Sequence, residues 1–202
     1  MGINLQKGQK IDLRKSGTNN GLSRVMVGLG WDEAQQEAPK GFLAALFSSK
    51  PADIDCDASA IICGSNGKMK ELVYYGALKS SNGAVQHQGD NLTGAGDGDD
   101  EQIMVDLNQL QSDVSKVVFI VNIYDANVRN QHFGLIRNAF IRLVDMSNNN
   151  EICRFNLSEK YSGMEGLIVC EIYRYNDDWK FNAIGQPVRK ASRVTDITSQ
   201  YA

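Results

Sequence analysis

The sequence has few of the groups that enzymes use for acid–base and nucleophilic chemistry. It contains only two histidines, His87 and His132, and neither lies in an HExxH or comparable zinc motif. No GxSxG nucleophile elbow is present either. These absences disfavour the common hydrolase classes and favour a protein that binds rather than catalyses.

Long apolar runs and basic stripes are also missing. No stretch approaches the roughly 20 apolar residues that cross a bilayer, and residues 1–7 lack the apolar stretch of a signal peptide. The 21 Lys and Arg residues are scattered, and the net charge is −3. We therefore expect a cytoplasmic protein that contacts membranes only indirectly and does not bind nucleic acid.

Cysteine pairs of the CxxC type are absent as well. The four cysteines each lie among apolar or strand-like neighbours: Cys56, Cys63, Cys153 and Cys170. We expect them to be reduced residues of the core.

The residues that are present fit one all-β domain over residues 1–202. Hydrophobic residues make up 42% and charged residues 22%, which is ordinary for a folded chain of this length. Turn-forming Asn, Asp and Gly residues, as at 65–68 and 148–150, indicate hairpins and mainly antiparallel sheets. The expected strands are rich in β-branched and aromatic residues and lie at 24–29, 58–63, 71–75, 102–107, 117–124, 140–144, 151–156, 167–173 and 179–184.

Hydrophobic spacing predicts that two sheets stack. Ile103, Val105 and Leu107 share one face of a strand, and the segment 117–121 is apolar on both faces, as in a central strand covered by a second layer. The expected fold class is therefore a mainly all-β, two-sheet antiparallel β-sandwich with short helical segments. The helical segments are expected at 107–111 and 158–161. Residues 189–202 are polar with few anchors, so we expect a mobile tail.

The strongest chemical signal is the run of residues 90–101, which reads Asp-Asn-Leu-Thr-Gly-Ala-Gly-Asp-Gly-Asp-Asp-Glu. Two carboxylates about 5 Å apart repel by roughly 3 kcal/mol at an effective dielectric near 20, so five together need a cation or must splay into water. Ca²⁺ takes about six to eight oxygen ligands, and the glycines let the backbone curve around it. An EF-hand is excluded because Leu92 and Gly94 stand at its third and fifth ligand positions.

A second acidic cluster, Asp53, Asp55 and Asp57, alternates with apolar residues. In an extended chain its carboxylates project from one side. We hypothesise that Asp55 and Asp57 approach the 90–101 run and complete one or two calcium sites. A solvated acidic hairpin loop is the alternative that the composition leaves open. A phosphate cradle is disfavoured because neither GxGxxG nor GxxxxGK[ST] is present.

The segment 87–101 resembles the signature of the TerD family of tellurium-resistance and stress-response proteins. It reads His-Gln-Gly-Asp-Asn-Leu-Thr-Gly, then Ala95, then Gly-Asp-Gly-Asp-Asp-Glu. Other segments agree with the family in order, so the resemblance spans nearly the whole chain: 27–32, 53–59, 123–126, 133–134, 137–140, 171–174 and 179–186.

The resemblance implies a two-sheet β-sandwich that binds one or two Ca²⁺ ions in a bacterial cytoplasmic protein of a tellurite, oxidative or phage-related stress system. It also implies partners among other stress-response proteins, including members of the same family. The candidate metal ligands that it implies are Asp55, Asp57, Asp90, Asn91, Asp97, Asp99, Asp100 and Glu101.

One departure from the family is an insertion at about 33–52, between Trp31 and the Asp-rich strand. Its apolar residues, such as Phe42 and Leu46, suit either a flap that covers the core or a partner-binding element. We prefer the flap.

We therefore expect a calcium-binding, non-enzymatic module that scaffolds or binds partners under the control of Ca²⁺. The alternative is a metal-dependent hydrolase in which the acidic cluster holds a catalytic metal. The crowding of Asp99 and Glu101 favours the module, because a full coordination shell leaves no water to activate. The dispersed cysteines argue against direct chelation of tellurite.

Overall fold

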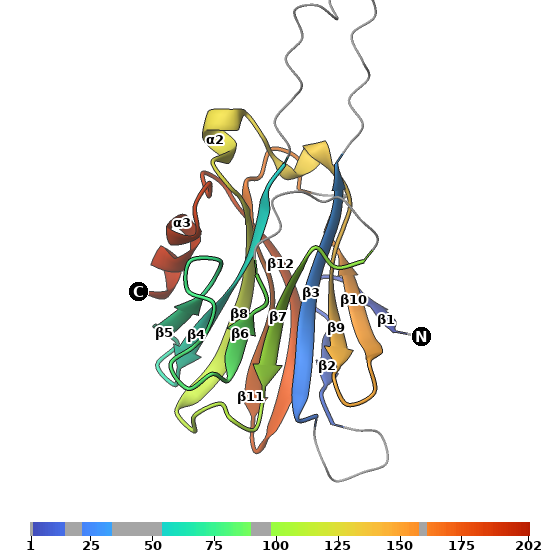
Figure 1. The fold of residues 1–202 in the computed structure, drawn as a ribbon, viewed down its shortest axis with the longest axis vertical. Helices are drawn as coiled ribbons and strands as arrows, with labels where there is room; N and C mark the ends of the chain where they lie inside the picture. The colour runs from blue at the N-terminus through green and yellow to red at the C-terminus, as the bar shows by residue number, and fades with distance from the viewer. Residues whose placement is uncertain (1, 15–21, 34–53, 90–97, 158–160) are drawn as a thin grey trace, which may run out of the picture.

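The computed structural model describes residues 2–14, 22–33, 54–89, 98–157 and 161–202. They form two six-stranded sheets packed face to face, which confirms the predicted β-sandwich (Figure 1). Sheet A has the order β1-β10-β9-β3-β7-β6, and sheet B has the order β2-β12-β11-β8-β4-β5. The pairing of β1 with β10 is parallel, whereas the other neighbouring strands pair antiparallel.

The strands of the two sheets have the following bounds. Sheet A consists of β1 (Ile3–Leu5), β3 (Arg24–Glu33), β6 (Val85–His87), β7 (Glu101–Asp106), β9 (Ile136–Asp145) and β10 (Asn150–Asn156). Sheet B consists of β2 (Lys10–Asp12), β4 (Cys56–Gly64), β5 (Met69–Val73), β8 (Val114–Ile123), β11 (Gly166–Tyr175) and β12 (Asp178–Val188). Each predicted strand segment overlaps one of these strands. The sequence missed β1, β2 and β6, because three residues are too few to show an alternating pattern.

The described helices are short: α2 (Ala126–Arg129), η1 (Phe133–Leu135), α3 (Val194–Thr198) and η2 (Ser199–Tyr201). None of them is long and apolar enough to cross a membrane. The helix predicted at 107–111 is wrong, because the Asp106 carboxylate accepts hydrogen bonds from the backbone N–H groups of Asn108 (3.1 Å) and Gln109 (3.3 Å) and closes a turn. Of the helical segment predicted at 158–161 only Tyr161 is described, and of the predicted insertion only Glu33 is described.

The core lies between the sheets and follows the predicted alternation. Ile103, Val105 and Leu107 are buried on the inner side of sheet A, as predicted, and Val117 and Phe119 face them from β8. The turns between hairpin strands also use the predicted residues. Gly67 and Asn149, for example, have φ values of 77° and 58° in the turns that follow β4 and β9.

The C-terminal segment covers the outer face of sheet B. Its Ala191 and Ile197 are fully buried there, together with Val194. Residues 189–202 therefore have more buried anchors than their polar sequence predicted, because the part of sheet B beneath them is apolar. The sheet residues that form this apolar face are Ile61, Cys63, Val118, Ile120 and Ile168.

Candidate functional site

The acidic segments meet at one end of the sandwich, because β3 ends where β4 and β7 begin (Figure 1). Trp31, near the end of β3, holds both neighbouring segments. Its backbone N–H donates to the carboxylate of Asp100 (2.9 Å), just before β7. Its indole N–H donates to the carbonyl of Ile54 (3.3 Å), just before β4. Two stretches that are distant in the sequence are thereby fixed beside each other.

Glu101 and His87 bind the backbone of β4 at this end, where the strand lacks a neighbour on one side. β5 pairs with β4 only from Ala60 onward, so the backbone before that point needs other partners. The N–H of Ala58 donates to Glu101 Oε2 (2.5 Å), and the carbonyl of Ala58 lies 3.1 Å from His87 Nε2. Both side chains are almost fully buried. They take the place of a neighbouring strand.

The tautomer of His87 follows from its two neighbours. Its Nδ1 accepts a hydrogen bond from the backbone N–H of Gly89 (3.2 Å), so the proton is on Nε2, which donates to the Ala58 carbonyl. The same Nε2 lies 3.6 Å from Glu101 Oε2. Because both ring nitrogens are engaged, His87 has a structural role here and no free lone pair for general-base catalysis.

Asp57 points away from Glu101. On β4, Cys56 and Ala58 face the core between the sheets, so Asp57 faces the outer side of sheet B. There it lies across from Asn122 of β8, whose Nδ2 donates to Asp57 Oδ2 (3.2 Å). Both residues are buried, with exposed fractions of 3% and 1%.

Asp99 lies on the outer side of sheet A and forms a two-point ion pair with Arg142 of β9. Nε of Arg142 donates to Oδ1 (2.7 Å), and a terminal nitrogen donates to Oδ2 (2.9 Å). The Asp99 side chain is fully covered. Gly28 of β3 makes room for it, because a Cβ at that position would collide with the Asp99 carboxylate. The hydrogen bonds that Arg142 donates to Asp99 raise the pKa of the Arg142 guanidinium.

The buried thiol of Cys56 lies near other carboxylates, which are placed on both sides of β4. Burial raises the pKa of this thiol well above its ordinary value. Four carboxylates add to the effect, in this order: Asp57, Glu101, Asp55 and Asp100. The thiol therefore stays protonated. All four cysteines are free and buried, as the sequence predicted.

Neighbouring negative charges also affect the pKa of Asp100. Burial raises its pKa, the hydrogen bond from the Trp31 N–H lowers it, and the nearby charges of Asp32 and Asp99 raise it further. A cation at this end would relieve that repulsion.

Four of the eight predicted ligands lie at the same end of the sandwich, with Asp57 and Glu101 on different sides of β4: Asp55, Asp57, Asp100 and Glu101. Asp99 lies apart from them against Arg142, and the other three, Asp90, Asn91 and Asp97, lie outside the described residues. Among the residues that the structure describes, no three Asp, Glu, His or Cys side chains form a group that could hold a metal ion. A metal at this end needs additional oxygen ligands.

The donor chemistry fits a hard cation. The four gathered side chains offer oxygen only, which is what Ca²⁺ prefers. Two further oxygens, Asn122 Oδ1 and Ser59 Oγ, are buried on the side of sheet B that carries Asp57 and have no hydrogen-bond partner within the described part of the chain. Unpartnered buried oxygens are uncommon and indicate a bound group such as a water or an ion.

Sequence reasoning missed Asn122 and Arg142. The sequence did contain a signal for Asn122, because it is the one polar residue in the otherwise apolar segment 117–123. The sequence contained no signal for Arg142, because its pairing with Asp99 depends on strand register. The register places Arg142 directly across from Gly28, and the Asp99 carboxylate lies over Gly28.

The carboxylate of Glu151 extends the Arg142 network and makes a pH-dependent contribution to stability. Hydrogen bonds from Arg154 and Arg142 lower the pKa of Glu151, against the opposing effect of burial. The contribution is therefore present above the unfolded-state pKa of about 4.5 and is lost as the pH falls through the lower folded-state value. We expect Glu151→Gln to reduce the free energy of unfolding at pH 7 by up to about 1 kcal/mol. Urea denaturation of both proteins should show this difference shrinking towards pH 3, and a difference that grows on acidification would contradict the assignment.

Comparison with known proteins identifies the family. A family model described as the TerD domain matches residues 1–201. The chain is 50% identical over 204 residues to the stress response protein SCP2 of Bacillus subtilis (strain 168), with all of both chains covered. It is 39% identical over 204 residues to the tellurium resistance protein TerD of Serratia marcescens, covering 100% of this chain and 97% of that protein.

The fold agrees with solved structures. A homologue of the telluride resistance protein TerD from Streptomyces coelicolor A3(2) superposes with a TM-score of 0.66 and 20% identity, covering 84% of this chain and 92% of the other. That likeness shows a shared fold. The match of the family model over almost the whole length, together with the identities to curated relatives, shows that the chain belongs to the TerD family of stress-response and tellurium-resistance proteins.

Proposed function

We propose that this protein is a calcium-binding, non-enzymatic module of a bacterial stress-response system, and that Ca²⁺ controls its binding of partners. The observation that carries the proposal is the placement of four carboxylates, those of Asp55, Asp57, Asp100 and Glu101, at the end of the sandwich where β4 and β7 begin. Carboxylates so close together repel one another, and a divalent cation removes that repulsion. One or two ions suit this number of donors.

The residues that would hold the cation are the four gathered carboxylates, with Asp90, Asn91 and Asp97 of the neighbouring run. Asp99 is not included in this set, because both of its oxygens accept hydrogen bonds from Arg142. Bound calcium would supply positive charge that fixes the ends of β4 and β7 relative to each other. In this proposal it activates no water.

A binding role is favoured over a metal-dependent hydrolase by the state of the groups nearest the carboxylates. The ring nitrogens of His87 are both engaged in hydrogen bonds, and the Cys56 thiol is held protonated. Neither group is available as a base or a nucleophile.

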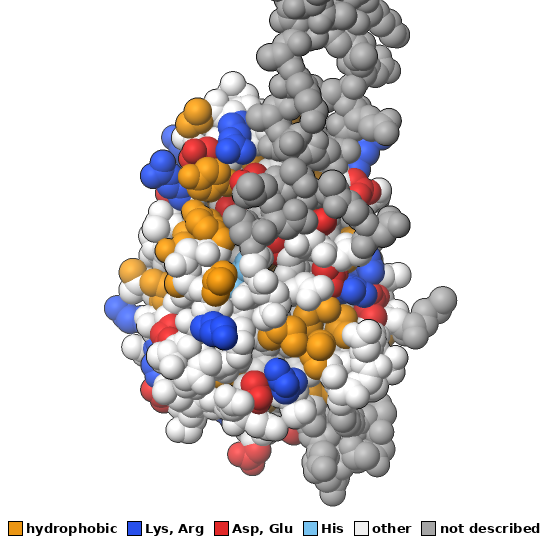
Figure 2. Space-filling model, viewed as in Figure 1, with side chains coloured by type: hydrophobic (Ala, Val, Ile, Leu, Met, Phe, Trp, Pro, Cys, Tyr) orange, Lys and Arg blue, Asp and Glu red, His pale blue; other side chains and the backbone are white. Residues whose placement is uncertain are grey.

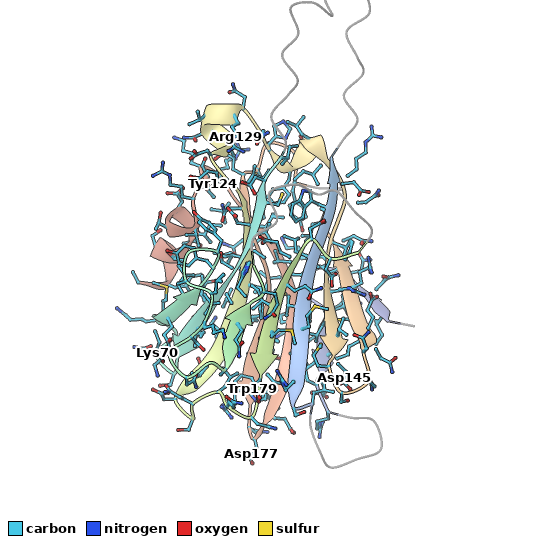
Figure 3. The ribbon with its side chains drawn as sticks, viewed as in Figure 1. Lys70, Tyr124, Arg129, Asp145, Asp177 and Trp179 are labelled. Atoms are coloured by element: carbon cyan, nitrogen blue, oxygen red, sulfur yellow. The ribbon has the colours of Figure 1, made fainter. Side chains whose placement is uncertain are left out.

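The acidic end is connected to a surface that suits partner binding. The N–H of Tyr124 donates to the carbonyl of Asp55 (2.8 Å), so the chain leading into α2 starts at the acidic cluster. Tyr124 packs edge-on against Tyr75, with ring centroids 6.3 Å apart, and Arg129 lies over the Tyr124 ring. Figure 2 shows apolar side chains grouped on the β5 and α2 side, and Figure 3 shows Tyr124 and Arg129 at the same end.

We propose that the partners are other stress-response proteins, including members of the same family, that bind this surface in the cytoplasm. Its exposed apolar residues include Val128, which is 75% exposed, and Tyr75. A change at Asp55 on calcium binding reaches Tyr124 through one hydrogen bond, and this short connection gives calcium a direct route to the partner surface.

Titration calorimetry of the chelator-treated protein with Ca²⁺ tests the proposal. We expect one or two binding events and at least a tenfold loss of affinity in Asp57→Asn, because the variant removes a buried negative charge from the cluster. The matched control is Asp113→Asn, which removes an exposed carboxylate paired with Lys70 away from the cluster. It should bind calcium as the wild type does. Absence of heat from the wild-type protein would refute the proposed function.

The same variants test whether calcium controls partner binding. Wild-type protein and Asp113→Asn should bind a purified family member differently with calcium and with chelator, whereas Asp57→Asn should lose the difference. Equal binding in calcium and in chelator by the wild type would remove the regulatory part of the proposal.

A further inference from the structure

Asn122 and Asp57 form a buried polar pair on the outer face of sheet B, next to an apolar part of that face. Along β8 the outward row runs Val118, Ile120, Asn122, and Val118 and Ile120 pack under the C-terminal segment. Asn122 is 1% exposed. An amide in this position needs a partner for each of its polar atoms.

The amide of Asn122 is oriented by Asp57. Its Nδ2 donates to Asp57 Oδ2 (3.2 Å), and the reverse orientation would place the amide oxygen against a carboxylate oxygen. Oδ1 therefore cannot be satisfied by turning the side chain over. It remains buried without a hydrogen-bond partner within the described part of the chain.

A second unpartnered oxygen lies on the same face. Ser59 follows Asp57 by two positions on β4, so their side chains share the outer side, and Asn122 lies across from Asp57 on β8. Ser59 Oγ is fully buried and also lacks a partner among the described residues. Two unpartnered oxygens beside one buried carboxylate indicate that a group binds between them.

Elsewhere in sheet B the structure contains a second Asn–carboxylate pair, and a lysine accompanies it. Asn182 of β12 donates to Glu171 of β11 (3.0 Å), and Lys116 of β8 lies 3.3 Å from the same carboxylate. A lysine thus supplies the cation beside that Asn–carboxylate pair. Asn182 Oδ1 is also buried without a hydrogen-bond partner within the described part of the chain, so the feature that marks this second pair is its lysine.

We propose that Asn122 Oδ1 is a direct ligand of a hard divalent cation, Ca²⁺ in the first place, that is bound with Asp57 on the outer side of sheet B. Neutral amide oxygens are ordinary calcium ligands, and a carboxylate beside an amide oxygen gives an oxygen-only half-site. The inference rests on the proposed calcium function and adds a residue outside both acidic segments. It also places one ion on the side of sheet B away from Glu101.

Calcium titration of the full chain, followed by calorimetry, tests the assignment with two leucine variants. Asn122→Leu keeps the approximate volume but removes the oxygen, and we expect at least a tenfold weaker calcium affinity for one site. Asn182→Leu makes the same change in the lysine-balanced pair and should leave calcium affinity unchanged. Unchanged affinity in Asn122→Leu, with normal binding by the wild type, would overturn the assignment and indicate that a water occupies the position.

Asn122→Asp provides a second test if the leucine variant does not fold. A carboxylate at this position should strengthen calcium binding, and it should lower the melting temperature in chelator because it repels Asp57. The rise in melting temperature on adding calcium should therefore be larger for Asn122→Asp than for the wild type. An equal or smaller rise would overturn the inference. Failure of the wild type to bind calcium at all would instead refute the proposed function, so the two failures are distinguishable.

Discussion

Calcium added to the chelator-treated protein is expected to raise its melting temperature by about 5–15 °C. A ligand that binds only the folded state stabilises it by about 2.7 to 4.1 kcal/mol when its free concentration is about 100 to 1,000 times its dissociation constant. For a chain of this size each kcal/mol corresponds to about 2–4 °C. The physical source of the gain is relief of the repulsion that raises the pKa of carboxylates such as Asp100 at this end of the sandwich. Differential scanning calorimetry measures the shift directly.

Magnesium is the control for charge alone. Mg²⁺ demands a small octahedral site and gives up its water reluctantly, so we expect a much smaller shift than with calcium at equal concentration. Asp57→Asn should lose part of the calcium shift, whereas Asp113→Asn should keep all of it. Identical melting curves in calcium and in chelator would show that the acidic end is stable without a metal.

Replacement of Arg142 by leucine should reduce the free energy of unfolding by roughly 3 kcal/mol. The change leaves the fully covered carboxylate of Asp99 without the guanidinium that donates to both of its oxygens. Breaking a buried ion pair from one side costs about 3–5 kcal/mol, and the low end applies because the Arg142 side chain is 28% exposed. Urea denaturation at pH 7 measures the loss.

A double-mutant cycle separates the ion pair from general packing effects. Asp99→Asn in the Arg142→Leu background should recover much of the lost stability, because the unpaired charge is gone. Arg24→Leu is the matched control on the same sheet, since Arg24 is 59% exposed and lies 3.8 Å from Asp106. It should change stability by about 1 kcal/mol or less. Equal losses in the two arginine variants would rule out a special role for Arg142.

The sheets were predictable because their signals are local. Alternation at Ile103, Val105 and Leu107 indicated which side of the strand is buried, and Asn149 stands in a turn that only a few residue types adopt readily. The C-terminal segment was harder to predict. Its Ile197 is buried because it covers an apolar face of sheet B. The residues of that face are far from Ile197 in the sequence, so the local pattern does not reveal the contact.

The site was predictable in composition but not in arrangement. The number of carboxylates in the segments 53–57 and 90–101 indicated a hard cation from charge repulsion alone. The sequence treated Asp99 as equivalent to Asp100 and Glu101, although the structure places it on the other side of sheet A from Glu101. Residues two positions apart share a side only within a regular strand, but Asp99 precedes β7 and the chain bends at Asp100, so the two carboxylates reach different surroundings.

The sequence by itself determined the β-sandwich, its hairpin turns, the reduced cysteines of the core and the chemical character of the acidic end, because each follows from local residue types and spacing. Only the tertiary structure decided the partners: Arg142 for Asp99, Asn122 for Asp57, and the Ala58 backbone for Glu101. These contacts join residues 43, 65 and 43 positions apart. Strand register and the packing of one sheet on the other fix them, and neither is a local property of the chain.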